Sequence, residues 1–169
     1  KRGDKVNYFI FNNKNSLEDM NLGIAGNSTR PRPQEVIEVE EVDGRKQGAL
    51  VYKTGGYKDL VIKRKLRLLK FDNYEVETLK IMNWLTNIED NRLIFKDYKE
   101  KCYKVKYVIV SDFEDYRGGN VDFEVAFYCE PFLFNTNEPD IEVLNGDFIF
   151  SDSDLEAEPI IRLSLPATP

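Results

Sequence analysis

The side chains that most often carry out chemistry in proteins are scarce in this chain. It contains no histidine, which excludes Ser-His-Asp and Cys-His nucleophile systems, histidine-ligated zinc and the commonest general base at neutral pH. Any chemistry would rest on carboxylates, lysines or tyrosines. The two cysteines, Cys102 and Cys129, are too few for a disulfide framework and lack the close spacing of metal ligands. We interpret them as buried thiols.

Carboxylates recur at alternate positions in Asp152, Asp154 and Glu156. Calcium loops use the same spacing, because a hard cation needs several oxygens from one bend of the chain. This segment lacks the following glycine and the distal glutamate of an EF-hand, so we interpret it as a solvated linker. The glycines between residues 44 and 56 match neither a P-loop nor a dinucleotide-binding turn. We therefore expect no catalytic, cofactor-binding or metal-binding residues and no cofactor, and we predict that the protein is not an enzyme.

Length and composition indicate one folded domain, and the charge points away from nucleic-acid binding. The chain has 169 residues, about the size of one domain with a fragment of another, and 41% of them are hydrophobic, enough for a core. Lysine and arginine total 24 against 30 aspartates and glutamates, which gives a formal charge of -6. A protein that grips phosphates usually has the opposite balance. The longest apolar runs are far shorter than the ~20 residues that cross a bilayer.

Most of the sequence favours β-structure. Apolar and β-branched runs separated by turn residues predict strands. The expected strands are 6–11, 35–42, 49–52, 59–69, 92–95, 101–110 and 120–134. Residues 16–34 have no periodicity and are predicted to be a loop, Gly55-Gly56 is predicted to turn the chain, and Arg117-Gly118-Gly119 is predicted to form a hairpin-like turn.

The basic run 63–67 is explained by strand alternation. Lys63, Lys65 and Arg67 share one parity, and Ile62, Leu66 and Leu68 share the other, which predicts a sheet with one wet and one dry face. We favour a solvated face over a nucleic-acid patch for the basic residues. Arg64 is the exception, because it falls on the dry parity.

One segment, residues 74–88, has helical periodicity. Leu79, Met82 and Leu85 recur at three-residue spacings with other apolar residues beside them, and they predict a stripe that covers one face of the sheet. Asp72 is predicted to cap the first turn, with Glu75 three residues later. Trp84 lies on or beside the stripe and is expected in the core. The predicted core under this stripe comprises Ile62, Leu66, Leu68, Val121, Phe123, Val125 and Phe127.

The order of these features resembles a known family. The succession is Phe9-Ile10-Phe11-Asn12-Asn13-Lys14-Asn15-Ser16, a proline-bounded loop before Glu35-Val36-Ile37-Glu38-Val39, Asp43-Gly44-Arg45, Gly56-Tyr57-Lys58-Asp59, Asn83-Trp84-Leu85, Arg92-Leu93-Ile94-Phe95, a strand through Tyr103 and Tyr107, and Phe123-Glu124-Val125-Ala126-Phe127-Tyr128-Cys129-Glu130-Pro131-Phe132. It resembles the N-terminal domain of the distal tail (Dit) proteins of siphophages, over roughly residues 6–134.

The resemblance implies a mainly β, α+β fold: a β-sandwich-like domain with one α-helix and a β-hairpin, related to the phage tail-tube fold. It implies a structural role in the virion tail, assembled in the host bacterial cytoplasm, as a hexameric ring that joins the tail tube to the tail tip or baseplate. The implied partners are other copies, the tube protein and tip or baseplate proteins, with DNA only in transit. Residues 1–150 would form the ring domain, and 151–169 a linker and the first strand of a truncated or missing galectin-like domain.

Two other classes of protein stay open at this point. A cell-surface or carbohydrate-binding β-sandwich would use exposed tyrosine or tryptophan rings to stack on sugars. An enzyme with two convergent carboxylates would need a pocket in which Asp and Glu have perturbed pKa values. Aligned surface aromatics would favour the first class, and a ring-shaped assembly would favour the tail component.

Overall fold

The computed structural model describes residues 7–26, 29–116, 120–137 and 148. The chain divides into two units, residues 1–137 and residues 138–169. All the helices and strands described below lie in the first unit. The predicted boundary after residue 150, the acidic segment 152–156 and the predicted strand after it lie outside the described residues.

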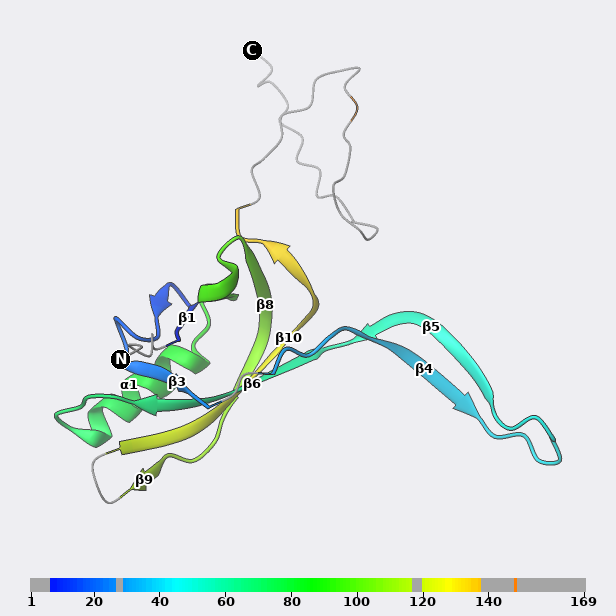
Figure 1. Cartoon of the computed structure of the whole chain (residues 1–169), viewed down its shortest axis with the longest axis horizontal. Helices are drawn as coiled ribbons and strands as arrows, with labels where there is room; N and C mark the ends of the chain where they lie inside the picture. Colours follow the sequence, from blue (N-terminus) through cyan, green and yellow to red (C-terminus); the bar gives the residue numbers. More distant parts are fainter. Residues whose placement is uncertain (1–6, 27–28, 117–119, 138–147, 149–169) are drawn as a thin grey trace, which may run out of the picture. The chain divides into compact units, whose positions relative to one another are not determined.

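The first unit is a mainly β, α+β domain (Figure 1). The elements are β1 (Phe9–Phe11), β2 (Lys14–Asn15), β3 (Leu22–Ala25), β4 (Gln34–Glu40), β5 (Leu50–Lys58), β6 (Leu60–Leu68), α1 (Tyr74–Thr86), β7 (Arg92–Phe95), the 3-10 helix η1 (Lys96–Tyr98), β8 (Lys101–Val110), β9 (Glu114–Tyr116) and β10 (Asn120–Asn135). A curled antiparallel sheet of eight strands has the order β2-β1-β7-β8-β10-β6-β3, with β9 on β10, and β4 and β5 form a separate two-stranded sheet. The predicted fold class, with one helix and a hairpin, is confirmed.

Strands β6 and β10 form the centre of the core. They pair antiparallel, with Val121 opposite Leu68 and Phe127 opposite Ile62. Because side chains alternate between the two faces of a strand, every second residue of each strand points to the same side. All seven residues of the predicted core are buried, and Arg64 is buried with them, on the parity that the sequence assigned to it.

Helix α1 closes the core, but of the predicted stripe Leu79, Met82 and Leu85 only Leu85 is fully buried. Ile81, Trp84 and Leu85 are buried, whereas Leu79 is 64% exposed and Met82 is only partly buried. Each residue turns an α-helix by about 100°, so Leu79 lies about 160° around the axis from Ile81. The buried side of the helix is therefore centred on the neighbouring apolar residues Ile81 and Trp84 together with Leu85.

The N-terminus of α1 is capped by Asn73 rather than by the predicted Asp72. The side chain of Asn73 accepts hydrogen bonds from the backbone nitrogens of Glu75 (3.1 Å) and Val76 (3.3 Å). Asparagine and aspartate are equally good caps. The choice between adjacent candidates therefore depends on which residue the chain places in the extended conformation before the first turn, and this is Asn73, with φ -131° and ψ 114°.

Asn12 joins the turn between β1 and β2 to the end of α1. Its Nδ2 donates to the backbone oxygens of Trp84 (2.9 Å) and Asn87 (2.6 Å). Its Oδ1 accepts from the backbone nitrogens of Glu89 (2.9 Å) and Asp90 (3.0 Å). Its φ of 48° lies in the left-handed region, which asparagine tolerates better than most residues. Residues more than seventy positions apart are thereby held together by one side chain.

Other sequence predictions differ from the structure as well, beyond shifts of one or two residues at the ends of β4, β6 and β10. Strand β3 lies within the predicted loop 16–34, because it pairs along the edge of β6, and the first strand begins at Phe9 rather than at residue 6. Gly55-Gly56 does not turn the chain: β5 continues through it. Gly55 has φ 78° at the register shift between Glu35 and Ile37, where the extra residues of a bulge need such backbone freedom. The predicted turn 117–119 lies outside the described residues.

Candidate functional site

Within the described ranges, no group of three or more His, Cys, Asp or Glu side chains is placed to hold a metal ion. Cys102 and Cys129 are both buried, as predicted. Burial is the main cause that raises the pKa of the Cys129 thiol, to about 12. No helix in the described part of the chain is long and apolar enough to cross a bilayer.

Trp84, the single tryptophan of the sequence, belongs to the core as predicted. It is 4% exposed and its Nε1 donates to the backbone oxygen of Phe11 at 2.9 Å. Its ring stacks on Phe9 with the two ring centres 5.8 Å apart. It is therefore not a surface ring on which a sugar could stack.

The basic residues of β6 are paired with carboxylates of β10. Arg67 donates from Nε and Nη2 to the two carboxylate oxygens of Asp122 at 2.6 and 2.9 Å, and the Nζ of Lys65 lies 3.4 Å from the same side chain. Lys63 lies 3.8 Å from Glu124. The hydrogen bond from Arg67 is the main cause that lowers the pKa of Asp122. These cross-strand pairs account for the basic run within the sheet, which agrees with a solvated face.

The most unusual surface in the described residues is the hairpin formed by residues 34–58, which we call the arm. Its strands β4 and β5 pair only with each other, and Figure 1 shows them as a ribbon separate from the large sheet. Every residue of β5 except Leu50 is exposed. An isolated two-stranded sheet is at best marginally stable in water.

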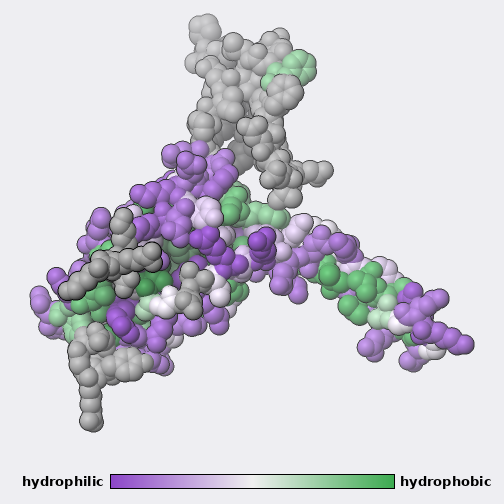
Figure 2. Space-filling view, viewed as in Figure 1, coloured by the Kyte–Doolittle hydropathy of each residue, from purple (hydrophilic) through white to green (hydrophobic). Residues whose placement is uncertain are grey.

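Apolar side chains are exposed on both faces of the arm. Val39 and Val51 are direct cross-strand partners and are 64% and 62% exposed, with Ile37 on the same face. Tyr52 is exposed on the opposite face, because it pairs with Glu38. Figure 2 shows the resulting green patch in the middle of the arm, with hydrophilic residues at its tip.

Polar contacts and one aromatic contact fix the arm near its base. The Nζ of Lys53 lies 2.6 Å from Glu35, and Thr54 donates from its hydroxyl to the backbone oxygen of Val36 at 3.1 Å. The ring of Tyr57 meets the ring of Phe132 in β10 edge-on, with the centres 4.8 Å apart. Tyr57 therefore ties the end of the arm nearest the large sheet to the rest of the domain, which we call the body. The apolar side chains farther along the arm make no comparable contact among the described residues and are exposed.

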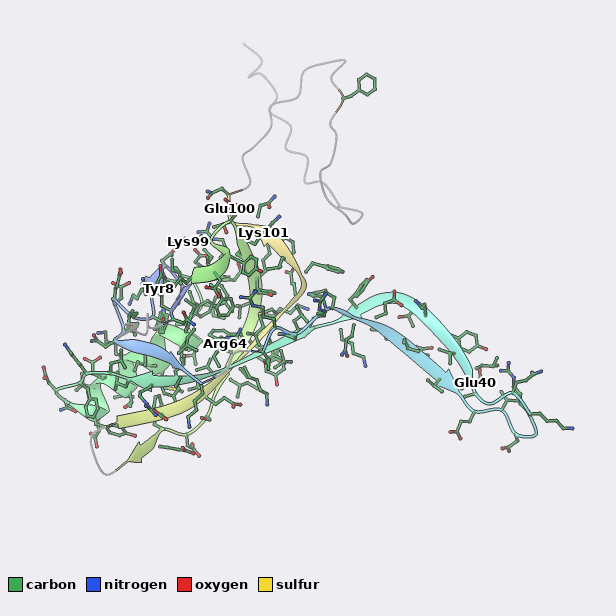
Figure 3. All side chains as sticks on the ribbon, in the orientation of Figure 1. Tyr8, Glu40, Arg64, Lys99, Glu100 and Lys101 are labelled. Carbon is green, nitrogen blue, oxygen red and sulfur yellow. The ribbon has the colours of Figure 1, made fainter. Side chains whose placement is uncertain are left out.

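Strand β4 of the arm and strand β8 of the body carry charges of opposite sign, although Glu35 already pairs with Lys53 of the arm and Lys106 with Asp59. Strand β4 carries Glu35, Glu38 and Glu40 and no cation. Strand β8 of the body carries three lysines and no carboxylate. Figure 3 labels Glu40 on the arm and Lys101 at the start of β8. The charges outside these pairs, Glu38 and Glu40 on β4 and Lys101 and Lys104 on β8, are opposite in sign.

The sequence alone did not identify this surface. The resemblance implied a hairpin, but the strand pattern of β4 looks like that of any half-buried strand, and β5 was interrupted in the prediction by its glycines. The sequence did contain one indication of this surface. Apolar side chains occur at both odd and even positions of β4 and β5, so neither face of the hairpin is wholly polar.

Comparisons of the chain with protein-family models, curated proteins and solved structures find no match.

Proposed function

We propose that this protein is a structural subunit of a siphophage or prophage tail. Its copies form a ring, hexameric in the family that the sequence resembles, which joins the tail tube to the tip or baseplate and leaves a channel for DNA. Its partners are further copies of the chain, the tube protein and tip or baseplate proteins. It is assembled in the host cytoplasm and resides in the virion tail.

The observation that supports this proposal best is the arm. A hairpin that exposes apolar side chains on both faces has a large free-energy gain from being covered by another surface. A second copy is the cover that we favour, because the glutamates of β4 complement the lysines of β8. This contact joins two different surfaces of the same protein.

Such a contact is heterologous, and heterologous contacts close into rings when the rotation between copies allows it. A channel for DNA also needs a lining that does not bind phosphate strongly. The formal charge of -6 and the pairing of Lys63, Lys65 and Arg67 with carboxylates agree with that requirement.

The test is negative-stain imaging of the full chain at high concentration, together with sedimentation velocity over a dilution series. We expect rings with an open centre and a concentration-dependent large species. The Val39→Asp variant should lose them, because it places a charge in the apolar patch of the arm. Leu79→Asp is the matched control, since Leu79 on α1 has the same 64% exposure as Val39 but lies outside the arm.

Two results would contradict the proposal. The first is a chain that remains monomeric at every concentration in the dilution series, because its copies would then form no ring. Rings that are lost equally in Val39→Asp and Leu79→Asp, or that survive in Val39→Asp, would show that the arm does not make the contact between copies. Circular dichroism of both variants checks that each one is folded.

A further inference from the structure

A cavity of about 310 Å³ opens in the body of the domain, outside the arm. Its wall is strongly basic, with Arg30, Arg32, Arg64, Lys96 and Lys101 against one carboxylate, that of Asp97. Aromatic rings, including Tyr8 and Phe95, complete the lining. Figure 3 labels Tyr8, Arg64 and Lys101, which come from three separate segments of the chain. The volume is at the lower end of the range for small-molecule sites.

Arg64 is the central cation of this cavity. Only 5% of the residue is exposed. Its Nη1 donates to the backbone oxygens of Thr29 (2.9 Å) and Lys63 (2.7 Å), and its guanidinium lies over the ring of Phe95 at 4.7 Å. Its Nε is buried without a hydrogen-bond acceptor among the described residues. A buried cation whose neighbours are neutral carbonyls and a ring has lost hydration without gaining a counter-ion.

The one carboxylate of the lining does not compensate for Arg64. Asp97 is paired with Arg30, at 3.0 Å. Both of these side chains are more than half exposed, so water and salt screen that pair. Burial is the main cause that lowers the pKa of Arg64, and the neighbouring charge of Arg30 lowers it further. The described residues that line the cavity therefore carry a net positive charge.

We propose that this cavity is a binding site for a small anion, in which Arg64 faces a carboxylate or phosphate group and the aromatic wall contacts the rest of the ligand. An arginine forms strong charge-assisted hydrogen bonds with either group. The rings of Phe95 and Tyr98, which carry Arg64 and Arg30 over one face each, line the same cavity and provide apolar surface for a planar or cyclic ligand part. The site is distinct from the arm and does not require assembly.

The probes are phenyl phosphate, benzoate, inorganic phosphate and phenol, titrated at constant ionic strength into the dilute full chain and followed by amide chemical shifts in NMR. We expect saturable shifts with phenyl phosphate or benzoate around Tyr8, Phe95 and Lys96. The stronger of these two identifies phosphate or carboxylate as the preferred group. Inorganic phosphate should bind more weakly because it lacks the ring, and phenol more weakly because it lacks the charge.

Variants connect the binding to the cavity. Arg64→Met keeps an unbranched side chain and removes the charge, and it should weaken binding by about tenfold or more. Lys96→Gln, on the more accessible part of the wall, provides a second test if Arg64→Met is unfolded. Lys63→Gln is the control, because it removes the same charge on the face of β6 that is paired with β10. It should leave the affinity unchanged.

The proposal is overturned if no anion gives saturable shifts, or if phenol binds as tightly as phenyl phosphate. It is equally overturned if Lys63→Gln weakens binding as much as Arg64→Met or Lys96→Gln, because the anion would then respond only to net charge. Failure of ring assembly would have no effect on these measurements, since they use the monomeric chain.

Discussion

Replacing Asn12 with alanine tests how the first turn is joined to the end of α1. The substitution removes four hydrogen bonds, two of which are solvent-exposed and two of which are partly buried. One bond contributes about 0.5–1.5 kcal/mol net, so four would contribute roughly 2–6 kcal/mol. Because two of the four are exposed to water, we expect a loss at the lower end, roughly 2–3 kcal/mol. Alanine with a left-handed backbone adds about 1 kcal/mol. The free energy of unfolding should therefore fall by roughly 3–4 kcal/mol.

The assay is urea denaturation followed by the fluorescence of Trp84, which reports on the core directly because it is the chain's one tryptophan. Asn12→Gly separates the two contributions, since glycine accepts the left-handed backbone but cannot make the bonds. It should lose roughly 2–3 kcal/mol.

Asn13→Ala is the control for Asn12→Ala. Asn13 lies in the same turn with φ 60°, and its side chain does not make the four bonds of Asn12. It should lose about 1 kcal/mol, from the backbone conformation alone. Equal destabilisation of Asn12→Ala and Asn13→Ala would refute the reasoning, because the side-chain bonds would then contribute nothing.

Three further predictions concern the core and its edges. Phe127 is fully buried, and the centre of its ring lies 5.5 Å from that of Phe9 and 5.4 Å from that of Phe11. Phe127→Ala should therefore lower the free energy of unfolding, measured by urea denaturation, by about 3–5 kcal/mol. An unchanged melting temperature would show that Phe127 is not part of the core. The hydrogen bond from Arg67 lowers the pKa of Asp122 in the folded protein. The ionised Asp122 carboxylate therefore contributes its full stabilisation above the pKa of an aspartate in the unfolded chain, about 3.9, and this stabilisation is lost as the pH falls through the lowered pKa of the folded state. Denaturation across that pH window should show a smaller acid-induced loss in Asp122→Asn, and an identical pH profile would exclude this role. The pKa of Cys129 is raised to about 12, and Cys102 is also buried. A thiol reagent at mildly alkaline pH should therefore label both cysteines slowly in the native chain and rapidly in guanidinium. Fast labelling of the native chain would contradict their burial.

Where the sequence prediction succeeded, the signal was local. The alternation in β6 identified both its buried face and its solvated face, and the apolar alternate residues of β10 identified the side that faces the core, because the period of a strand depends only on its own backbone. The bounds of β7 and β8 were predicted without error for the same reason. The alternation also showed that Arg64 is a cation on the side of β6 that faces the core, but it did not indicate which residues surround Arg64.

Where the prediction failed, a contact with a distant segment decided the outcome. Leu79 and Ile81 are both apolar residues of one helix, and only the position of the sheet determines which of them is buried. Strand β3 has little strand character of its own and forms because the edge of β6 is available to it. Gly55 forms a bulge instead of a turn because β4 continues to pair with the chain beyond it.

The amino-acid sequence by itself determined that this chain is mainly β with one helix, that its thiols are buried, and that histidine chemistry is excluded. These properties follow from residue types and short-range periods, which need no knowledge of the partner strand. Tertiary structure alone decided that Arg64 lines a basic cavity and that, among the described residues, the apolar side chains of the arm are left exposed. Both depend on which distant side chains arrive beside a residue, and strand pairing between remote segments sets that arrangement.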